Sequence, residues 1–244
     1  MSNPYYAPGT GRAEKVNDLF DAIARRYDLL NDVLSLGLHR HWKRQAADLA
    51  AVKSGSRALD LCCGTGDISF ALAARGAEVT GLDFSRNMLA MAERQAAIRN
   101  PKSEVRNPKF IQGDATKVPF SDGTFDVVTV GYGLRNLSNW EAGLREMLRV
   151  VKPGGRLVVL DFGKPANALW RGIYFMFLRL VVPLMGLVFC GNASAYSYIL
   201  ESLKYYPGQE GVAAKMRDLG LADVRTINLL GGAMSINYGE KPRA

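Results

Sequence analysis

The chain has 244 residues, of which 48% are hydrophobic and 22% charged, a balance typical of a soluble globular protein with a sizeable core. The formal net charge of +8 permits attraction to nucleic acid or to an anionic membrane, but no basic run is dense enough for a nucleic-acid-binding arm. Cys62, Cys63 and Cys190 exclude a disulfide framework, and adjacent cysteines without a nearby histidine make a poor zinc site, so no metal is expected. No apolar signal core opens the chain, which predicts a protein of the reducing cytoplasm.

The N-terminal part is predicted to be helical. Residues 1–12 hold two prolines and two glycines, which predicts disorder. Apolar spacing then predicts a helix over residues 15–27, short helices and loops up to residue 38, and a helix over about residues 39–51. Two roles are open for this part: a cover over the edge of a sheet, or a lid that lines a pocket with Tyr27, His39 and Trp42.

A glycine turn follows an apolar run and marks a candidate ligand site. Residues 57–61 read as a buried strand, Gly64-Thr65-Gly66 as a tight turn, and residues 67–75 as a helix whose N-terminus faces the turn. The glycines allow a nucleotide-like ligand to approach the backbone closely.

The charges around this turn favour S-adenosylmethionine over a dinucleotide. Asp60 and Asp67 would repel a pyrophosphate, and Ser69 stands where a dinucleotide fingerprint has a third small residue. S-adenosylmethionine carries a sulfonium and an ammonium and no phosphate. Asp83 ends the next predicted strand, where an acid that binds ribose hydroxyls belongs. The alternative is a turn that binds no nucleotide and is capped by Asp67.

Strands and helices alternate beyond the turn. Further strands are predicted over residues 78–82, 109–113, 125–130 and 156–162, with helices over residues 85–98 and 137–151 and a loop over residues 100–108. A closing hairpin is predicted from strands over residues 224–229 and 234–240. The sequence therefore predicts an α/β fold with a doubly wound, seven-stranded, mostly parallel sheet.

Residues 169–191 form the most apolar stretch of the chain. Arg171, Arg179 and Pro183 interrupt it, and the charge-free part from residue 180 is too short to span a bilayer. Four interpretations are open: protein core, a dimer face, a channel for an apolar substrate, and a surface that contacts a membrane. Helices over about residues 195–205 and 209–219 follow. The predicted parts are a helical lid (1–52), a ligand-binding α/β core (53–166), an apolar helical insertion (167–222) and the closing hairpin (223–244).

In an open α/β sheet, ligands bind beyond the carboxyl ends of the strands. Three carboxylates follow successive strand ends and suit a cationic nucleoside. We assign Asp83 to the ribose hydroxyls, Asp114 with Ala115 to the adenine edge, and Asp60 to the amino-acid end. The alternative for Asp114 is a loop cap. The segment GYGLRN at residues 131–136 follows the central strand.

Six segments of the chain form a recognisable set of motifs: FDAIARRYDLLN (20–31), SLGLHR (35–40), LDLCCGTGD (59–67), GLRN (133–136), RVVKPGG (149–155) and LLGG (229–232). With these motifs the chain resembles the C-methyltransferases of ubiquinone and menaquinone biosynthesis, within the class I S-adenosylmethionine-dependent enzymes. The resemblance covers nearly the whole length. It implies S-adenosyl-L-methionine as cofactor, with contacts at Thr65, Asp83, Asp114 and Ala115. A further family position, often serine, is Gly131 here, so any side-chain contact there is lost.

The implied reaction is methylation of a ring carbon, which requires an electron-rich quinol, since a quinone would not attack a sulfonium. Arg135 is assigned to stabilise the developing phenolate, and Asn136 to orient the phenol. As a base Arg135 is excluded, because a guanidinium stays protonated. The alternative is that Arg135 only pairs with a carboxylate near the cofactor.

The implied substrate is polyprenylated. Cys62-Cys63 and Gly131-Tyr132 resemble the naphthoquinone members, which favours conversion of demethylmenaquinol to menaquinol. Alternatives are a benzoquinol of ubiquinone biosynthesis, and a non-catalytic cofactor-binding subunit of a biosynthetic complex. No nucleic-acid partner is expected, because GYGL replaces the Pro-Pro-aromatic element of nucleobase amine methyltransferases at residues 131–134. Peripheral contact with the inner face of the membrane and a homodimer are further expectations.

Overall fold

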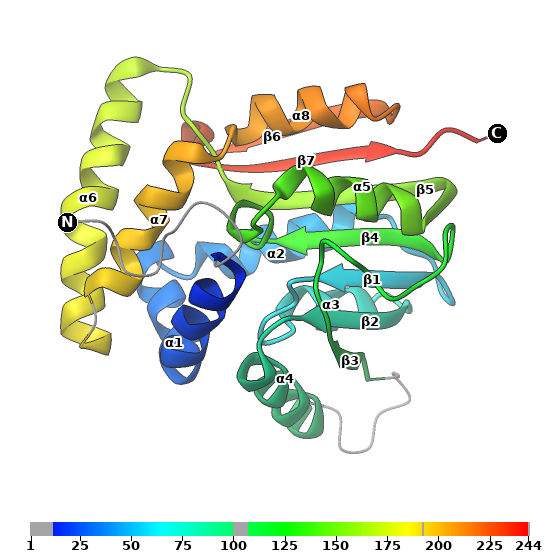
Figure 1. Cartoon of the computed structure of the whole chain (residues 1–244), viewed down its shortest axis with the longest axis horizontal. Coiled ribbons are helices and arrows are strands. Elements are labelled where there is room, and N and C mark those ends of the chain that lie inside the picture. Colours follow the sequence, from blue (N-terminus) through cyan, green and yellow to red (C-terminus); the bar gives the residue numbers. More distant parts are fainter. Residues whose placement is uncertain (1–11, 100–106, 192, 244) are drawn as a thin grey trace.

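The computed structural model describes residues 12–99, 107–191 and 193–243. Residues 1–11 of the segment predicted to be disordered and residues 100–106 of the predicted loop therefore lie outside the described residues. Arg12, also predicted to be disordered, is instead the first residue of a helix. Within the described part, seven strands form one sheet in the order β3-β2-β1-β4-β5-β7-β6 (Figure 1). They are β1 (Arg57–Leu61), β2 (Glu78–Asp83), β3 (Lys109–Gln112), β4 (Phe125–Gly131), β5 (Val151–Phe162), β6 (Ala222–Leu229) and β7 (Met234–Glu240).

The sheet is parallel from β3 to β5, and β7 runs antiparallel to both β5 and β6. The predicted α/β fold with a doubly wound, mostly parallel sheet and a closing hairpin is thus confirmed. Strand β5 begins earlier than predicted, at Val151, because that residue pairs with Phe125 before a register shift in β4.

Side chains alternate between two core clusters because successive residues of a strand point to opposite faces. Leu59 and Leu157 lie in one cluster, with residues of α5 (Trp140–Val150) and α8 (Gly208–Asp218). Ala58 and Val158 lie in the other, with residues of α2 (Leu38–Leu49) and α3 (Asp67–Ala73). Both faces of the parallel strands are therefore buried, as the apolar composition of β4 indicates.

Helix α4 (Arg86–Arg99) lies beside α3. Arg99 of α4 stacks over the ring of Phe70 at 4.5 Å and pairs with Asp67 at 3.3 Å. The hydroxyl of Ser85 accepts a hydrogen bond from the Met88 amide at 3.1 Å, so Ser85 caps the N-terminus of this helix.

The N-terminal part forms one long helix rather than the predicted helix and loops. Helix α1 runs over Arg12–Ser35, since no glycine or proline interrupts it, and it ends where Gly37 adopts a left-handed conformation with φ of 77°. Arg12 is fixed at the start of α1 by a 2.6 Å hydrogen bond to the carbonyl of Arg135.

Helices α6 (Ala168–Cys190) and α7 (Ala193–Tyr205) stand with α1 beyond the carboxyl ends of the parallel strands (Figure 1). One side of α6 is buried through Tyr174, Leu178 and Val182. The other side exposes apolar residues such as Leu180 (60%) and Leu184 (59%). Among the described helices, α6 is long and apolar enough to cross a membrane by length and composition, with only 22% of its most apolar window buried.

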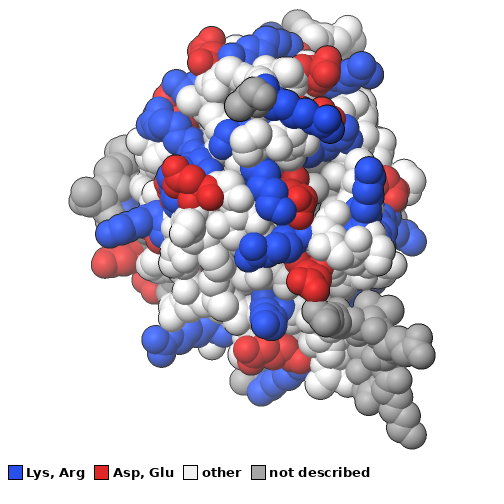
Figure 2. All heavy atoms as spheres, turned by 90° about the vertical axis from the view of Figure 1, so that its right-hand side faces the viewer, with Lys and Arg blue, Asp and Glu red and all other residues white. Residues whose placement is uncertain are grey.

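The opposite end of the molecule carries mixed charge. Figure 2 views the side from which the parallel strands start, and blue basic side chains there are interleaved with red acidic ones. The apolar surface of α6 and the charged surface therefore lie at different ends of the sheet.

Candidate active site

Two cavities meet at Tyr132, which follows the carboxyl end of β4. The first, here called the glycine-turn cavity, has a volume of about 100 Å³ and is lined by the turn at Gly64, the end of β2 and the segment after β3. The second, here called the apolar cavity, has a volume of about 440 Å³ and lies under α1, α2, α6 and α7. Because Tyr132 lines both, a ligand in one cavity adjoins a ligand in the other.

Asp83 is the polar centre of the glycine-turn cavity. Its carboxylate accepts hydrogen bonds from the amides of Gly64 at 2.8 Å and Ser85 at 2.9 Å. Burial raises the pKa of Asp83 above its ordinary value, and the amide bonds oppose that shift. The predicted ribose-binding acid thus lies against the glycine turn, with its carboxylate at the cavity wall.

Asp114 and Ala115 also line this cavity. Oδ1 of Asp114 accepts hydrogen bonds from the amide of Thr116 at 2.7 Å and from its hydroxyl at 2.8 Å. Asp114 therefore caps the loop after β3, which was the alternative interpretation of this residue, and does so at the cavity wall.

Asp60 lies below the turn rather than in the glycine-turn cavity. It is 1% exposed, and its two oxygens accept hydrogen bonds from the hydroxyls of Ser69 at 2.6 Å and Thr129 at 2.8 Å. Burial raises the pKa of Asp60 to about 6. Together with Thr65 it lines a third, small cavity of about 30 Å³ that adjoins Tyr132.

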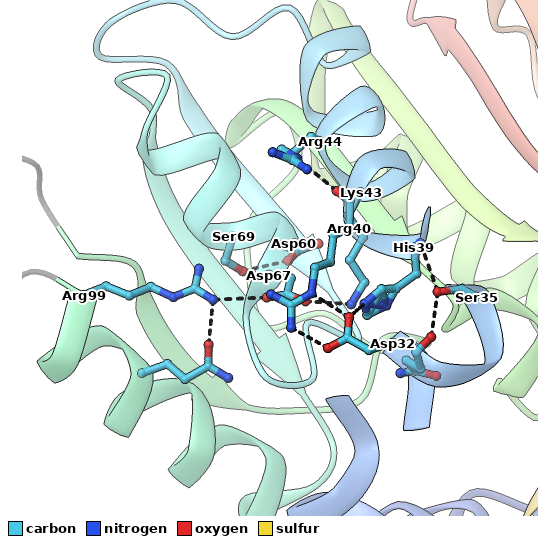
Figure 3. A network of polar contacts seen from close by, with 12 residues as sticks. Asp32, Ser35, His39, Arg40, Lys43, Arg44, Asp60, Asp67, Ser69 and Arg99 are labelled. Carbon is cyan, nitrogen blue, oxygen red and sulfur yellow. Dashed lines mark hydrogen bonds and ion pairs between the residues drawn. The ribbon is translucent and has the colours of Figure 1, made fainter. Parts of the chain in front are cut away.

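Asp67 does not present a free charge to the turn, contrary to the electrostatic argument made from sequence. Lys43 of α2 pairs with it at 2.8 Å and Arg99 at 3.3 Å (Figure 3). The nearby Lys43 lowers the pKa of Asp67 against the effect of burial. Asp83 and Asp60 are therefore the acidic residues on which the argument for a cationic ligand now rests. The sequence spacing did not predict that Lys43 pairs with Asp67.

The three predicted glycines differ in position. Gly64 has a φ of 55°, and a Cβ there would meet no atom within 4 Å, so its backbone faces open space in the cavity. Gly66 instead caps α3, and a Cβ on it would lie 2.9 Å from the Phe70 ring. Gly131 lines two of the cavities, and a Cβ there would meet Cδ1 of Ile68 at 2.4 Å.

Asn136 lies on the glycine-turn side, not on the apolar side where it was expected to orient a phenol. Its amide nitrogen donates to the carbonyl of Tyr132 at 3.0 Å. Its Oδ1 is buried and accepts no hydrogen bond from any described residue. A buried acceptor in this cavity suits a ligand that carries hydroxyl or amine donors.

Arg135 is buried in an ion pair with a carboxylate, which was the alternative interpretation of this residue, although the sequence did not identify Asp161 as the partner. Its guanidinium donates to Asp161 Oδ1 at 2.8 Å and to the Tyr132 carbonyl at 2.7 Å, and its amide donates to Asp161 Oδ2 at 3.1 Å. Its side chain stacks over Phe162 at 4.4 Å and lines the apolar cavity. Asp161 is the penultimate residue of β5, and Asp83 is the last residue of β2, so an acid close to a strand end was the signal that could have found Asp161.

The apolar cavity confirms that residues of the N-terminal helices line a pocket. His39 and Trp42 of α2 line it, as does Leu19 of α1, while the side chain of Tyr27 lies outside the described ones. The other lining residues are mostly aliphatic and aromatic: Leu34, Leu36, Leu38, Phe162, Trp170, Ile173, Tyr174, Phe177, Leu178, Val182, Tyr196, Tyr198, Ile199, Leu230, Ala233 and Met234. The cavity is suited to a long apolar molecule.

The described residues hold no cluster of three or more His, Cys, Asp or Glu side chains placed for a metal ion. Cys62 and Cys63 are free thiols, and burial raises the pKa of both well above the usual value. They are therefore neutral at pH 7 and contribute packing beside the glycine turn.

The buried ion pair between Arg135 and Asp161 predicts a stability effect. In Arg135→Met, Asp161 stays buried without its cation, so the free energy of unfolding should fall by about 3–5 kcal/mol. Adding Asp161→Asn to the same chain removes the stranded charge and should restore most of the loss, which urea unfolding of both variants measures. A free energy of unfolding of Arg135→Met within about 1 kcal/mol of the wild-type value would show that the ion pair does not stabilise the turn after β4.

Comparison with known proteins identifies the family of the chain. The model of the ubiE/COQ5 methyltransferase family matches residues 10–241. The chain is 42% identical to the demethylmenaquinone methyltransferase of Desulfitobacterium hafniense (strain Y51) over 238 residues, covering 96% of this chain and 93% of that protein. It is also 42% identical to the ubiquinone/menaquinone biosynthesis C-methyltransferase UbiE of Ectopseudomonas mendocina (strain ymp), covering 96% and 92%.

Solved structures share the fold at low identity. An S-adenosylmethionine-dependent methyltransferase from Aquifex aeolicus matches with a TM-score of 0.57 and 18% identity, covering 82% of this chain and 89% of that one. The [4+2]-cyclase SpnF matches with a TM-score of 0.65 and 17% identity over the full length of both chains. Since a cyclase shares the fold, the fold alone does not define the reaction. The match to the family model and the two relatives does define the family: the chain belongs to the ubiE/COQ5 methyltransferase family.

Proposed function

We propose that this protein transfers a methyl group from S-adenosyl-L-methionine to a ring carbon of a polyprenylated quinol, converting demethylmenaquinol to menaquinol. The observation that carries the proposal is the pair of cavities that meet at Tyr132: one beside a glycine turn with strand-end carboxylates, the other large and apolar. The family relatives named for demethylmenaquinone and quinone-biosynthesis methyl transfer support the same reaction.

The glycine-turn cavity fits S-adenosylmethionine. Asp83 offers its carboxylate to ribose hydroxyls, Oδ1 of Asn136 accepts from a donor of the ligand, and the backbone at Gly64 is open to close approach. Ala115 and Asp114 lie where the adenine edge was assigned, and Thr65 lies with Asp60 nearer the amino-acid end. When bound, this cofactor supplies a methyl group on a positively charged sulfur.

The apolar cavity is assigned to the quinol ring and its isoprenoid tail. Its volume and aliphatic lining suit a hydrocarbon chain, and the Tyr132 wall that it shares with the glycine-turn cavity supports a ring position next to the cofactor. Arg135 places a guanidinium in this wall, where negative charge develops on the phenolic oxygen, and Asp161 holds that guanidinium in position. The ring must be in its dihydroxy form, because only that form supplies electron density to the attacking carbon.

The exposed side of α6 is proposed to rest on a membrane surface. Trp170 and Ile173 line the apolar cavity and are also exposed, as are Leu36 and Leu230. The cavity mouth is therefore surrounded by apolar surface, through which a membrane-dissolved substrate can enter without crossing water. Arg171 and Arg179 lie on the same helix and are exposed.

The reaction itself gives the first test. Purified protein should methylate demethylmenaquinol under anaerobic conditions with labelled S-adenosylmethionine, and the oxidised quinone should give no product. A tail-matched benzoquinol in direct competition should be the poorer substrate, as read from product masses. Preference for the benzoquinol would contradict the ring assignment. Methylation of the oxidised quinone would contradict the mechanism, and no methylation of either quinol would favour a non-catalytic subunit.

The cofactor assignment predicts a binding defect. Asp83→Ala removes the acceptor of the ribose hydroxyls, so affinity for S-adenosylmethionine should weaken by about 1–3 kcal/mol in calorimetry. The control is Asp48→Ala, an exposed carboxylate of α2 that lines none of the three cavities. Unchanged affinity in Asp83→Ala would show that the ribose binds elsewhere.

The membrane assignment predicts a partition defect. The double variant Leu180→Asp with Leu184→Asp should bind vesicles containing phosphatidylglycerol at least about tenfold more weakly than the wild type, because two exposed leucines no longer enter the interface. The control is Ile98→Asp, an exposed apolar residue near the end of α4. If the wild type and both variants float with the vesicles to the same extent, the proposal is contradicted. If the double variant no longer forms a dimer that the wild type forms, the exposed face of α6 is a dimer interface instead.

A further inference from the structure

His39 occupies a position in the apolar cavity that neither the cofactor assignment nor the Arg135 ion pair uses. It lies in the first turn of α2, is 4% exposed, and lines the cavity together with Tyr132 and Arg135. Among mostly aliphatic and aromatic walls, a buried imidazole is an exception that requires a polar partner.

One ring nitrogen of His39 has such a partner. Nε2 lies 2.9 Å from Oδ1 of Asp32, and Figure 3 shows the Asp32 carboxylate between His39 and Arg40. Arg40 donates to both oxygens of Asp32 at 2.6 Å and lowers the pKa of that carboxyl, so Asp32 is ionised and can only accept. Nε2 of His39 therefore carries the hydrogen, and in the neutral ring Nδ1 holds a lone pair.

Nδ1 of His39 is buried and has no hydrogen-bond partner among the described residues. The ring is neutral at pH 7, because burial lowers the pKa of His39 to about 4. Of the charged groups around it, Lys43 and Arg40 on the same helix also lower this pKa, while Asp32 of α1 and Asp67 of α3 raise it. The His39 ring, which lines the cavity and is fixed by a carboxylate, therefore carries an unused proton acceptor.

We propose that Nδ1 of His39 is the group that accepts the proton of the quinol hydroxyl, with Asp32 as the positioning residue that fixes the tautomer. This inference rests on the proposed function, since it requires a quinol in the apolar cavity. It assigns the base that Arg135, as a permanent cation, cannot supply.

The step balances as follows. The O–H bond of the quinol breaks and its proton moves to Nδ1 of His39, while the ring carbon beside that oxygen forms a bond to the methyl group. The methyl–sulfur bond breaks with its electron pair remaining on sulfur. The methylated carbon then releases its hydrogen as a proton to water, and His39 returns its proton to the oxygen. One proton is released overall, and the quinol is restored as its methylated form.

A weak base is sufficient for this step. As the ring carbon attacks the methyl group, electron density leaves the hydroxyl oxygen, so the hydroxyl becomes far more acidic than in the free quinol. The Arg135 guanidinium in the same wall stabilises the negative charge that the departing proton leaves on this oxygen. The imidazolium that forms lies 2.9 Å from the Asp32 carboxylate, which stabilises it at that moment. A hydrogen bond to Nδ1 also turns the hydroxyl toward α2, which limits the orientations of the ring.

Nuclear magnetic resonance tests the contact without turnover. The chain has two histidines, so His41→Gln leaves His39 as its only imidazole. In that variant, a short-tailed demethylmenaquinol added with S-adenosylhomocysteine should shift the ¹⁵N signal of His39 Nδ1 upfield, as expected for an acceptor of a hydrogen bond. An unchanged Nδ1 signal under conditions where the quinol binds would overturn the proposal.

Kinetics tests the role. His39→Gln should lower kcat by about 10²-fold or more while the KM for S-adenosylmethionine stays within threefold, and the exposed His41→Gln should retain wild-type kcat. Asp32→Asn should give an intermediate loss of kcat, because the tautomer is no longer fixed. A His39→Gln enzyme with kcat within threefold of the wild type would overturn the proposal but leave the proposed function intact. Absence of methylation by the wild type would instead contradict the proposed function.

Discussion

The ion pair between Arg135 and Asp161 is the interaction on which the candidate site depends. It joins the turn after β4 to the end of β5, with side chains that are 6% and 1% exposed. The same guanidinium holds the carbonyl of Tyr132, and the carbonyl of Arg135 receives the hydrogen bond from Arg12 of α1. Removing such a buried pair from water is costly, so its value lies in fixing one arrangement of the turn and of the helix above it.

This arrangement accounts for the wall between the cavities. Tyr132 has a φ of 60°, which is unfavourable for an aromatic residue and requires support from its surroundings. Its carbonyl accepts hydrogen bonds from both Arg135 and Asn136, and its ring lies edge-on to Phe162 at 5.9 Å. Held in this way, Tyr132 lies between the glycine-turn cavity and the apolar cavity.

The sequence predicted the sheet well because strand burial and glycine turns leave local patterns: the apolar run before Gly64 and the acid at Asp83 identified the ligand end of the sheet. The sequence did not predict the features that depend on contacts between distant parts of the chain. Asp161 of β5 pairs with Arg135 of the turn after β4, Lys43 pairs with Asp67 from another helix, and Asn136 lines the glycine-turn cavity. Helix α1 is continuous, although the pattern of residues 28–35 suggested loops, because no helix-breaking residue interrupts it before Gly37.

The central claim is that the methyl donor and the quinol ring bind on the two sides of Tyr132. The most direct measurement is an anaerobic crystal structure with S-adenosylhomocysteine and a short-tailed demethylmenaquinol. The account predicts the nucleoside beside Asp83, the ring in the apolar cavity against Tyr132, and one ring hydroxyl within about 3 Å of Nδ1 of His39. A nucleoside bound away from Asp83, or a quinol ring outside the apolar cavity, would contradict it.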